Sequence, residues 1–212
     1  MIKTYLISFL LLISFTVSAQ DLVTIQHKAY KTTYSKSKNY PVKVEWWLTK
    51  AMVSCPTKIK RTDNFGPDPK AIQYTNLQQY YFNSGYDRGH VFPAADGGCN
   101  LTMMVESFYF SNMLPQTPQL NRGDWKMVEE LTRLEALQDD SVYVWAGAVG
   151  EIKKVGTLSI PKQCWKVIYV KKTKEWFAFL FNNDNTKANG INDNKVSVKV
   201  IEQISGYRFR AK

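Results

Sequence analysis

The sequence predicts an α+β fold with a mainly antiparallel central sheet flanked by helices. Strand-like apolar patterns lie on both sides of one long amphipathic helix pattern, without regular β–α–β alternation. The 212 residues contain no internal repeat and no low-complexity linker. With 44% hydrophobic and 22% charged residues, the chain can bury a core without help from a metal ion or a disulfide bond. We therefore expect one folded domain over residues 40–212, preceded by two short segments.

The first of these segments, residues 1–19, has the pattern of a secretory signal peptide. A short basic start precedes an apolar stretch over residues 5–17, and small residues follow up to Ala19. We expect cleavage between Ala19 and Gln20. The apolar stretch is too short to span a bilayer. The sequence thus predicts a secreted or periplasmic protein without a membrane partner.

The second segment, residues 20–39, is interpreted as a polar lead-in. Residues 28–39 are rich in Lys, Ser and Thr, and the start of this stretch is expected to be mobile. His27 lies in the same segment, and we expect it to be a solvated side chain without a role in the function.

The elements of the domain are read from hydrophobic periodicity. Residues 40–48 alternate between apolar and polar, which is typical of a strand, and residues 58–70 contain the Gly and Pro of a long loop. Residues 123–138 carry apolar side chains at helical spacing and predict the main helix. Further strands are expected at 141–148, 163–171 and 175–181, followed by an Asn-rich and Asp-rich loop at 182–194. Residues 195–205 fit either a helix or a strand.

The net charge is strongly positive. The chain has 28 Lys and Arg against 18 Asp and Glu, a net charge of +10. This charge favours a polyanionic partner such as nucleic acid, although a basic exported domain without such a partner is an equal alternative. Three cysteines, Cys55, Cys99 and Cys164, allow three disulfide pairings, and none has the spacing of a zinc site.

A cluster around His90 carries the chemical information. His90 follows Asp87, Arg88 and Gly89 directly, so that an imidazole and a guanidinium share one short turn. Such a pair suits a phosphodiester, because the arginine can donate to its oxygens and the histidine can act as a base toward water. The alternative is a purely structural histidine.

Downstream polar residues extend the cluster. Asn112 and Asn121 stand nine residues apart on a Pro-bounded loop that leads into the main helix, and Glu129 and Arg133 are four apart within it. Each has a simpler explanation: Asn121 as a helix N-cap, and Glu129 with Arg133 as a surface ion pair contributing less than about 1 kcal/mol.

Four short motifs follow one another in order. They are Asp87-Arg88-Gly89-His90, Ser111-Asn112-Met113, Pro115-Gln116, and Leu120-Asn121-Arg122-Gly123 with Trp125. In this order they resemble the DNA/RNA non-specific endonucleases, which are sugar-non-specific, metal-dependent nucleases with a ββα-metal (His-Me finger) active site. The resemblance covers residues 40–207.

The resemblance implies specific catalytic and metal-binding roles. His90 would be the general base that activates water, and Asn121 would be the only protein ligand of a Mg²⁺ ion, with Mn²⁺ as an alternative ion. Glu129 would orient a metal-bound water. A neutral Asn ligand leaves nearly the whole charge of the ion to polarise the phosphate, and a histidine with an ordinary pKa of about 6.5 suits proton transfer near neutral pH.

The same resemblance implies the remaining contacts. Arg88 would contact the phosphate and help to form the catalytic site. Arg61, Arg133 and Asp87 would contact the substrate, and Asn112 would hold the site in shape and touch the substrate.

The implied function is an exported endonuclease that cuts DNA and RNA with little sequence specificity and leaves 5′-phosphate ends. A catalytically silent nucleic-acid-binding protein is the main alternative. A phosphodiesterase for small nucleotides and a toxin with a dedicated inhibitor or immunity protein are further alternatives. The oligomeric state is left open.

Overall fold

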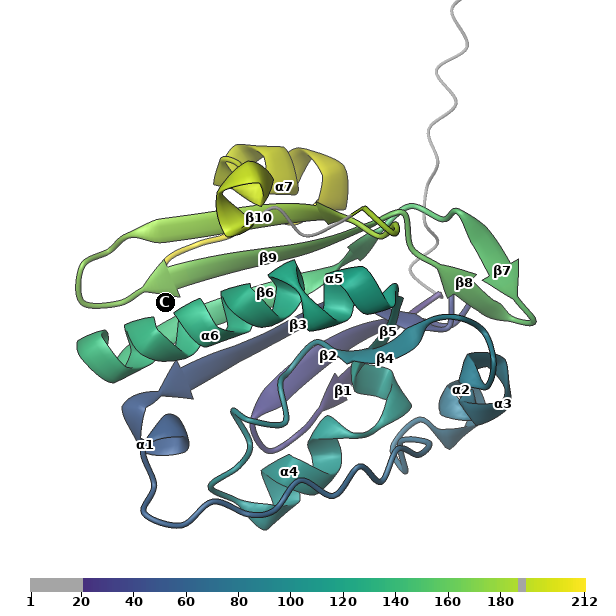
Figure 1. Ribbon diagram of the computed structural model, residues 1–212, viewed down its shortest axis with the longest axis horizontal. Helices are drawn as coiled ribbons and strands as arrows, with labels where there is room; N and C mark the ends of the chain where they lie inside the picture. Colours follow the sequence, from purple (N-terminus) through teal and green to yellow (C-terminus); the bar gives the residue numbers. More distant parts are fainter. Residues whose placement is uncertain (1–20, 187–189) are drawn as a thin grey trace, which may run out of the picture.

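A six-stranded antiparallel sheet forms the centre of the fold in a computed structural model that describes residues 21–186 and 190–212 (Figure 1). The predicted signal peptide lies outside these residues. In spatial order the strands are β1 (Leu22–Gln26), β2 (Tyr30–Ser35), β3 (Tyr40–Thr49), β6 (Ser141–Val149), β9 (Gln163–Val170) and β10 (Trp176–Asn182). The α+β class and the four strands predicted from periodicity are confirmed.

Helices cover both faces of the sheet (Figure 1). The main helix α6 (Asp124–Asp139) packs on one face, against side chains such as Val142 and Val144 of β6. The intervening Tyr143 and Trp145 point to the other face, where α7 (Val198–Ser205) covers them. Residues 195–205, which fitted a helix or a strand, thus contain a helix, and this helix buries the second face of the sheet.

The lead-in over residues 20–39 differs from the expectation of a mobile polar segment. It contributes β1 and β2, which pair with each other and then with β3. The inward positions of β2 are Tyr30, Thr32 and Tyr34, all buried. Thr and Tyr favour strands, but their polar atoms conceal the alternation that an aliphatic strand would show.

His27 is correspondingly buried, not solvated. It is 3% exposed in the connection between β1 and β2. Its Nε2 lies 2.9 Å from Oδ2 of Asp68, and its Nδ1 lies 3.6 Å from a carboxylate oxygen of Glu106. Ser111 also donates to Asp68. His27 therefore connects the N-terminal hairpin to two distant segments of the chain.

Shorter elements lie outside the central sheet, most of them between β3 and α6. A strand ribbon is made by β4 (Asp87–His90) and β5 (Met113–Gln116), and a second ribbon by β7 (Lys153–Val155) and β8 (Leu158–Ile160). The short helices are α1 (Lys50–Val53), α2 (Ile72–Thr75), α3 (Gln78–Tyr81), α4 (Leu101–Ser107), η1 (Phe110–Asn112), α5 (Pro118–Arg122) and η2 (Ile191–Asn194). As predicted, residues 58–70 form a loop without a helix or strand. None of the described helices is long and apolar enough to cross a membrane.

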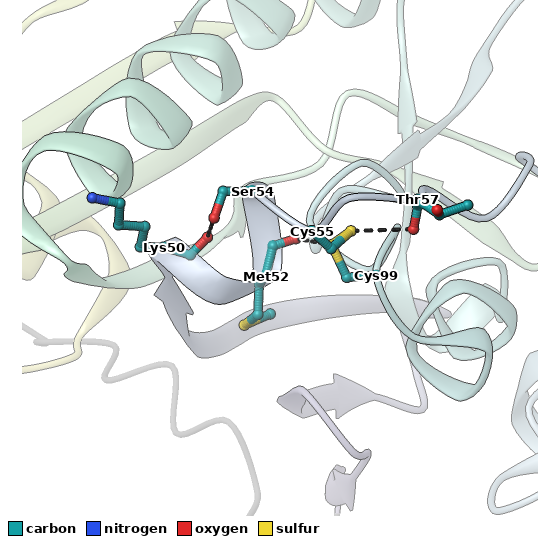
Figure 2. The surroundings of a disulfide bond; sticks show 6 residues. All are labelled: Lys50, Met52, Ser54, Cys55, Thr57 and Cys99. Atoms are coloured by element: carbon teal, nitrogen blue, oxygen red, sulfur yellow. Dashed lines mark hydrogen bonds between the residues drawn. A yellow bond between two sulfur atoms is a disulfide. The ribbon is translucent and has the colours of Figure 1, made fainter.

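One disulfide bond selects among the three possible cysteine pairings. Cys55, just after α1, is joined to Cys99, just before α4, as Figure 2 shows. The backbone N–H of Ile59 donates to the carbonyl of Gly98 at 2.8 Å and reinforces this connection. Cys164 is a free, buried thiol. The disulfide thus fastens the start of the 58–70 loop to the segment that follows His90.

Candidate active site

The β4–β5 ribbon and α6 form the frame of the site. Arg88 and His90 alternate with Gly89 along β4, so their side chains lie on the same face of the strand. The sequence predicted a short turn here, and the structure has a strand instead. A side chain at Gly89 would overlap the side chain of Gln116 on the partner strand, which explains the glycine between the two functional residues.

Two hydrogen-bonded side chains hold this frame together. The indole Nε1 of Trp125 on α6 donates to the backbone carbonyl of His90 at 3.0 Å. Asn112 is fully buried, and its amide accepts from Phe92 N at 2.8 Å and donates to Phe92 O and Ser107 O at 2.9 and 2.8 Å. All these partners are backbone atoms. Asn112 therefore holds the site in shape, and the expectation that it also touches substrate is wrong.

A cavity of about 390 Å³ opens between the ribbon and α6. Six of the eight predicted site residues line it: Arg61, Arg88, His90, Asn121, Glu129 and Arg133. Asn112 and Asp87 do not line it. The structure thus brings together residues that are up to 72 positions apart, because Arg61 and Arg133 both reach one cavity.

His90 has the properties of a neutral base. It is 8% exposed, and its Nε2 has no hydrogen-bond partner among the described residues. Burial, followed by the nearby positive charges of Arg61 and Arg88, lowers its pKa to about 3. The imidazole is therefore unprotonated at neutral pH, with a ring nitrogen available to accept a proton.

Aromatic rings support the two arginines. The Arg88 guanidinium lies 4.2 Å from the ring centroid of Phe65, and that of Arg61 lies 4.9 Å from the ring centroid of Phe108. Both rings also pack edge-on against His90, at centroid distances of 5.5 and 4.8 Å. Cation–π contacts of this kind hold a guanidinium in place without neutralising it. The cations therefore stay available for an anionic ligand.

Asn121 is oriented by Asp87. The Asn121 Nδ2 donates to Oδ2 of Asp87 at 2.9 Å, and Arg122 donates to both oxygens of the same carboxylate at 2.8 Å. Burial alone would raise the pKa of Asp87, but the hydrogen bonds from Arg122 and Asn121 lower it. A carboxylate engaged in this way positions Asn121. Asp87 also lines a neighbouring cavity, and its contact with substrate stays a prediction. Asn121 itself is not an N-cap, because it lies within α5 and Gly123 is the N-cap residue of α6.

The donor set fits a single hard cation. A carboxylate accepts hydrogen bonds, so Asp87 fixes the amide nitrogen of Asn121 toward itself and leaves the carbonyl oxygen Oδ1 free. Oxygen is the ligand that Mg²⁺ prefers, and this ion keeps most of its waters. Among the described residues there is no group of three or more His, Cys, Asp or Glu side chains that could hold a metal. One amide oxygen in a cavity with space for water suits Mg²⁺ better than a transition metal.

Charged groups behind the cavity surround Glu129. Arg133 pairs with the buried Asp96 at 3.2 Å, so the surface ion pair between Glu129 and Arg133 is not formed. Lys166 is 1% exposed, and its ammonium lies 4.2 Å from the ring centroid of Trp125. Burial raises the pKa of the Glu129 carboxyl; Lys166 and Arg133 oppose that rise, and Asp96 adds to it.

Sequence reasoning missed several members of this site. Lys126 lines the cavity together with Glu129 and Arg133 at positions i, i+3 and i+7 of α6, so helical spacing could have revealed it. Arg122 stands inside a quoted motif but received no role. Asp96 and Lys166 come from separate parts of the chain, and no local pattern marks them.

A two-stranded ribbon bearing a histidine and an arginine, packed on a helix bearing a carboxylate, defines the class of ββα-metal nucleases. The matching sequence family is described as DNA/RNA non-specific endonuclease, and the match covers residues 11–212. The chain belongs to this family. The predicted enzyme class, a nuclease among the hydrolases, is confirmed by the names of its relatives.

Individual relatives agree with this assignment. "Nuclease" of Nostoc sp. is 31% identical over 195 residues, which cover 85% of this chain and 70% of that protein. "Nuclease EXOG, mitochondrial" of Mus musculus is 26% identical over 88% of this chain and 56% of its own length, so the chain spans about half of that relative. A solved structure, titled as the EndoG/EndoGI complex and the mechanism of EndoG inhibition, superposes with a TM-score of 0.80 at 24% identity, over 88% of this chain and 84% of that one. It supports the fold.

Proposed function

We propose that this protein hydrolyses phosphodiester bonds of both DNA and RNA with little sequence specificity and leaves 5′-phosphate ends. The observation that carries the proposal is the shared cavity, in which the unprotonated His90 and the oriented amide of Asn121 lie among several cationic side chains. The positive groups are Arg61, Arg88, Arg122, Lys126 and Arg133.

The chain's own residues account for the steps of the reaction. Arg61 and Arg88, supported on aromatic rings, bind the phosphate oxygens and neutralise charge that develops on them. The imidazole of His90 accepts a proton from the attacking water, and the depressed pKa keeps the ring unprotonated at the working pH. Attack of the water on phosphorus breaks the bond to the 3′-oxygen. That oxygen takes up a proton from water and becomes a 3′-hydroxyl, and the phosphate stays on the 5′-oxygen of the next nucleotide.

The proposed cofactor is Mg²⁺, with Mn²⁺ as a substitute. Asn121 Oδ1 would hold the ion, and Glu129 would orient water around it. When bound, the ion supplies Lewis-acid charge to the phosphate and the departing oxygen. The side chains that contact the phosphate carry no base-reading pattern, which supports a substrate range set by phosphates.

We also propose that the protein acts outside the cytoplasm, in the periplasm or beyond the cell. The signal-peptide pattern of residues 1–19 supports export. The Cys55–Cys99 disulfide supports it independently, because such bonds persist in oxidising compartments.

The decisive experiment incubates purified protein with supercoiled plasmid and with total RNA, each with Mg²⁺ and with EDTA. Degradation of both polymers only in Mg²⁺, with product ends that a 5′-phosphate-dependent exonuclease digests, is the expected result. Intact polymers that still shift in a gel would contradict the proposal and favour a silent binding protein.

A further inference from the structure

A second cavity of about 300 Å³ lies beside the catalytic one. Arg61, Arg88 and Asn121 line both cavities, so the second continues directly from the phosphate-binding groups. Its other walls are different in character. They include Gln78 and the turn that joins α3 to β4, with Phe82 and Asn83. The cavity therefore combines cations on one side with an aromatic ring and neutral amides on the other. The Asp87 carboxylate also lines it, and Arg122 pairs with that carboxylate at 2.8 Å.

Phe82 is unusually exposed for a residue of its kind. It is 73% exposed, the largest exposed fraction among the large apolar side chains of the described residues. Single exposed apolar residues are common on protein surfaces. Phe82 is distinguished by its location, because it lines a cavity that also contains Arg88, only six residues further along the chain.

The turn that presents Phe82 is held firmly. The preceding Tyr81 is buried and stacks on Phe110 at a centroid distance of 5.4 Å and an interplanar angle of 18°. Ser84 Oγ donates to Tyr81 O at 2.9 Å and accepts from Tyr86 N at 3.1 Å. Phe82 is thus fixed through its neighbours while its own ring stays exposed, an arrangement that presents a ring for stacking at a small entropic cost.

We propose that this second cavity is a nucleobase subsite, in which Phe82 stacks on the base next to the scissile phosphate and the amides of Gln78 and Asn83 contact the edge of that base. Every base has a π-face, so stacking on an aromatic ring is tolerant of sequence. An amide both donates and accepts hydrogen bonds, so Gln78 and Asn83 can meet any of the bases. The subsite therefore adds affinity for a nucleotide without demanding one sequence.

This inference rests on the proposed nuclease function and deepens it, because it assigns a binding role to a base where the catalytic cavity addresses only phosphate. It predicts that the protein distinguishes a nucleotide from a base-free sugar phosphate at one position beside the cut. Polyanion binding by charge alone would not produce this distinction.

The test is a double-mutant cycle between protein and substrate. Single-stranded oligodeoxynucleotides carry one abasic tetrahydrofuran residue, moved through the positions on either side of a mapped cleavage site, and kcat/KM at that bond is measured with Mg²⁺. For the wild type, we expect loss of the base at one flanking position to lower kcat/KM about 10-fold. Phe82→Ala should lower kcat/KM on the intact strand by a similar factor, and removing the base should then cost this variant little more.

Matched variants isolate stacking from other effects. Phe82→Tyr should keep the wild-type ratio of intact to abasic cleavage, and Phe82→Leu should lose most of it. Ile72→Ala changes an exposed apolar residue (58% exposed) that lines neither cavity, and its ratio should equal that of the wild type. Because Phe82 is exposed, thermal melting of its variants should match the wild type.

Two failures are distinguishable. If the wild type cuts the oligonucleotides but Phe82→Ala shows the full wild-type ratio at every abasic position, the subsite is refuted and the nuclease function stands. If the wild type cuts neither plasmid, RNA nor oligonucleotide in Mg²⁺, both proposals fall together.

Discussion

The Nδ2 of Asn121 donates a hydrogen bond of 2.9 Å to Oδ2 of Asp87, and this bond decides which end of the Asn121 amide remains free. Arg122 holds the same carboxylate through both of its oxygens. Asp87 and Asn121 lie 34 positions apart, and the sequence predicted a direct contact for each, with the substrate for Asp87 and with the metal ion for Asn121. In the folded protein, one of them acts through the other.

Removing Asp87 should therefore weaken Mg²⁺ binding without removing the proposed ligand, Asn121. In Asp87→Ala the Asn121 amide is free to rotate, and we expect the Mg²⁺ concentration for half-maximal cleavage to rise about 10- to 100-fold, the usual effect of losing a group that orients a ligand. Asn121→Ala should lose metal-dependent activity, with recovery at high Mg²⁺. A magnesium titration of cleavage checks both variants. An unchanged half-maximal concentration in Asp87→Ala would show that this carboxylate does not position Asn121.

His90→Ala should lower turnover by about two to four decades, because a general base typically contributes that much. Its affinity for DNA should stay close to that of the wild type, since the arginines that contact phosphate are retained. Single-turnover cleavage and a binding titration in EDTA measure the two quantities separately. Cleavage at the wild-type rate would remove His90 from its assigned role.

The stability of the protein should depend on pH through His90. Burial and the two arginines lower the pKa of folded His90 to about 3, whereas the unfolded side chain titrates near about 6.5. Between these values the unfolded state binds more protons, so the free energy of unfolding should fall as the pH falls through this window. Urea unfolding of wild type and His90→Gln at pH 7.0 and 4.5 isolates the effect. A loss of stability between the two pH values that is equally large in His90→Gln would contradict this assignment.

Asn112→Ala should act on stability, with activity following the folded fraction. The change leaves backbone groups of Phe92 and Ser107 without partners in a buried setting, at a cost of about 3 kcal/mol. Asn76→Ala, at an exposed position, should change stability by less than about 0.5 kcal/mol. Chemical unfolding compares the two. If Asn112→Ala kept full stability but lost cleavage, the residue would have a direct catalytic role instead.

Loss of the Cys55–Cys99 bond should reduce both stability and cleavage. The bond closes a separation of 44 residues, which corresponds to about 4 kcal/mol of unfolded-state entropy. It also fastens the loop that leads to Arg61, so the double variant Cys55→Ser/Cys99→Ser should show a lower kcat/KM at a temperature where it is fully folded. In an Arg61→Ala background, breaking the bond should have little further effect on kcat/KM. Strict additivity of the two losses would mean that the disulfide does not act through Arg61.

The motifs around His90 and Asn121 could be predicted from sequence because the residues that meet in the cavity also lie in short, ordered stretches. The strand alternation of β3 and the periodicity of α6 were equally visible. The N-terminal hairpin could not be predicted in this way. The buried residues of β2 are a threonine and two tyrosines, whose polar groups do not produce an apolar alternation. His27 was missed for the same reason: its partners Asp68 and Glu106 become neighbours only in the folded chain.

Misassigned roles have a common physical cause. Asn112 stands inside the right motif, but the motif does not say whether a side chain points to a ligand or to another residue. The pairing of Arg133 with Asp96 likewise depends on how α6 sits over the loop after His90. Composition indicated a cation-rich surface; only the fold shows which cations share one cavity.

The position of the disulfide has a consequence for when the enzyme is complete. The bridge fastens the loop carrying Arg61 to the segment after His90, and thiols in a reducing cytoplasm stay unpaired. In a chain whose cysteines are still reduced, the loop that carries Arg61 would lack this covalent connection. With the proposed export, the bond would form only after the protein has left the cytoplasm, so full activity would be reached away from the nucleic acids of the producing cell.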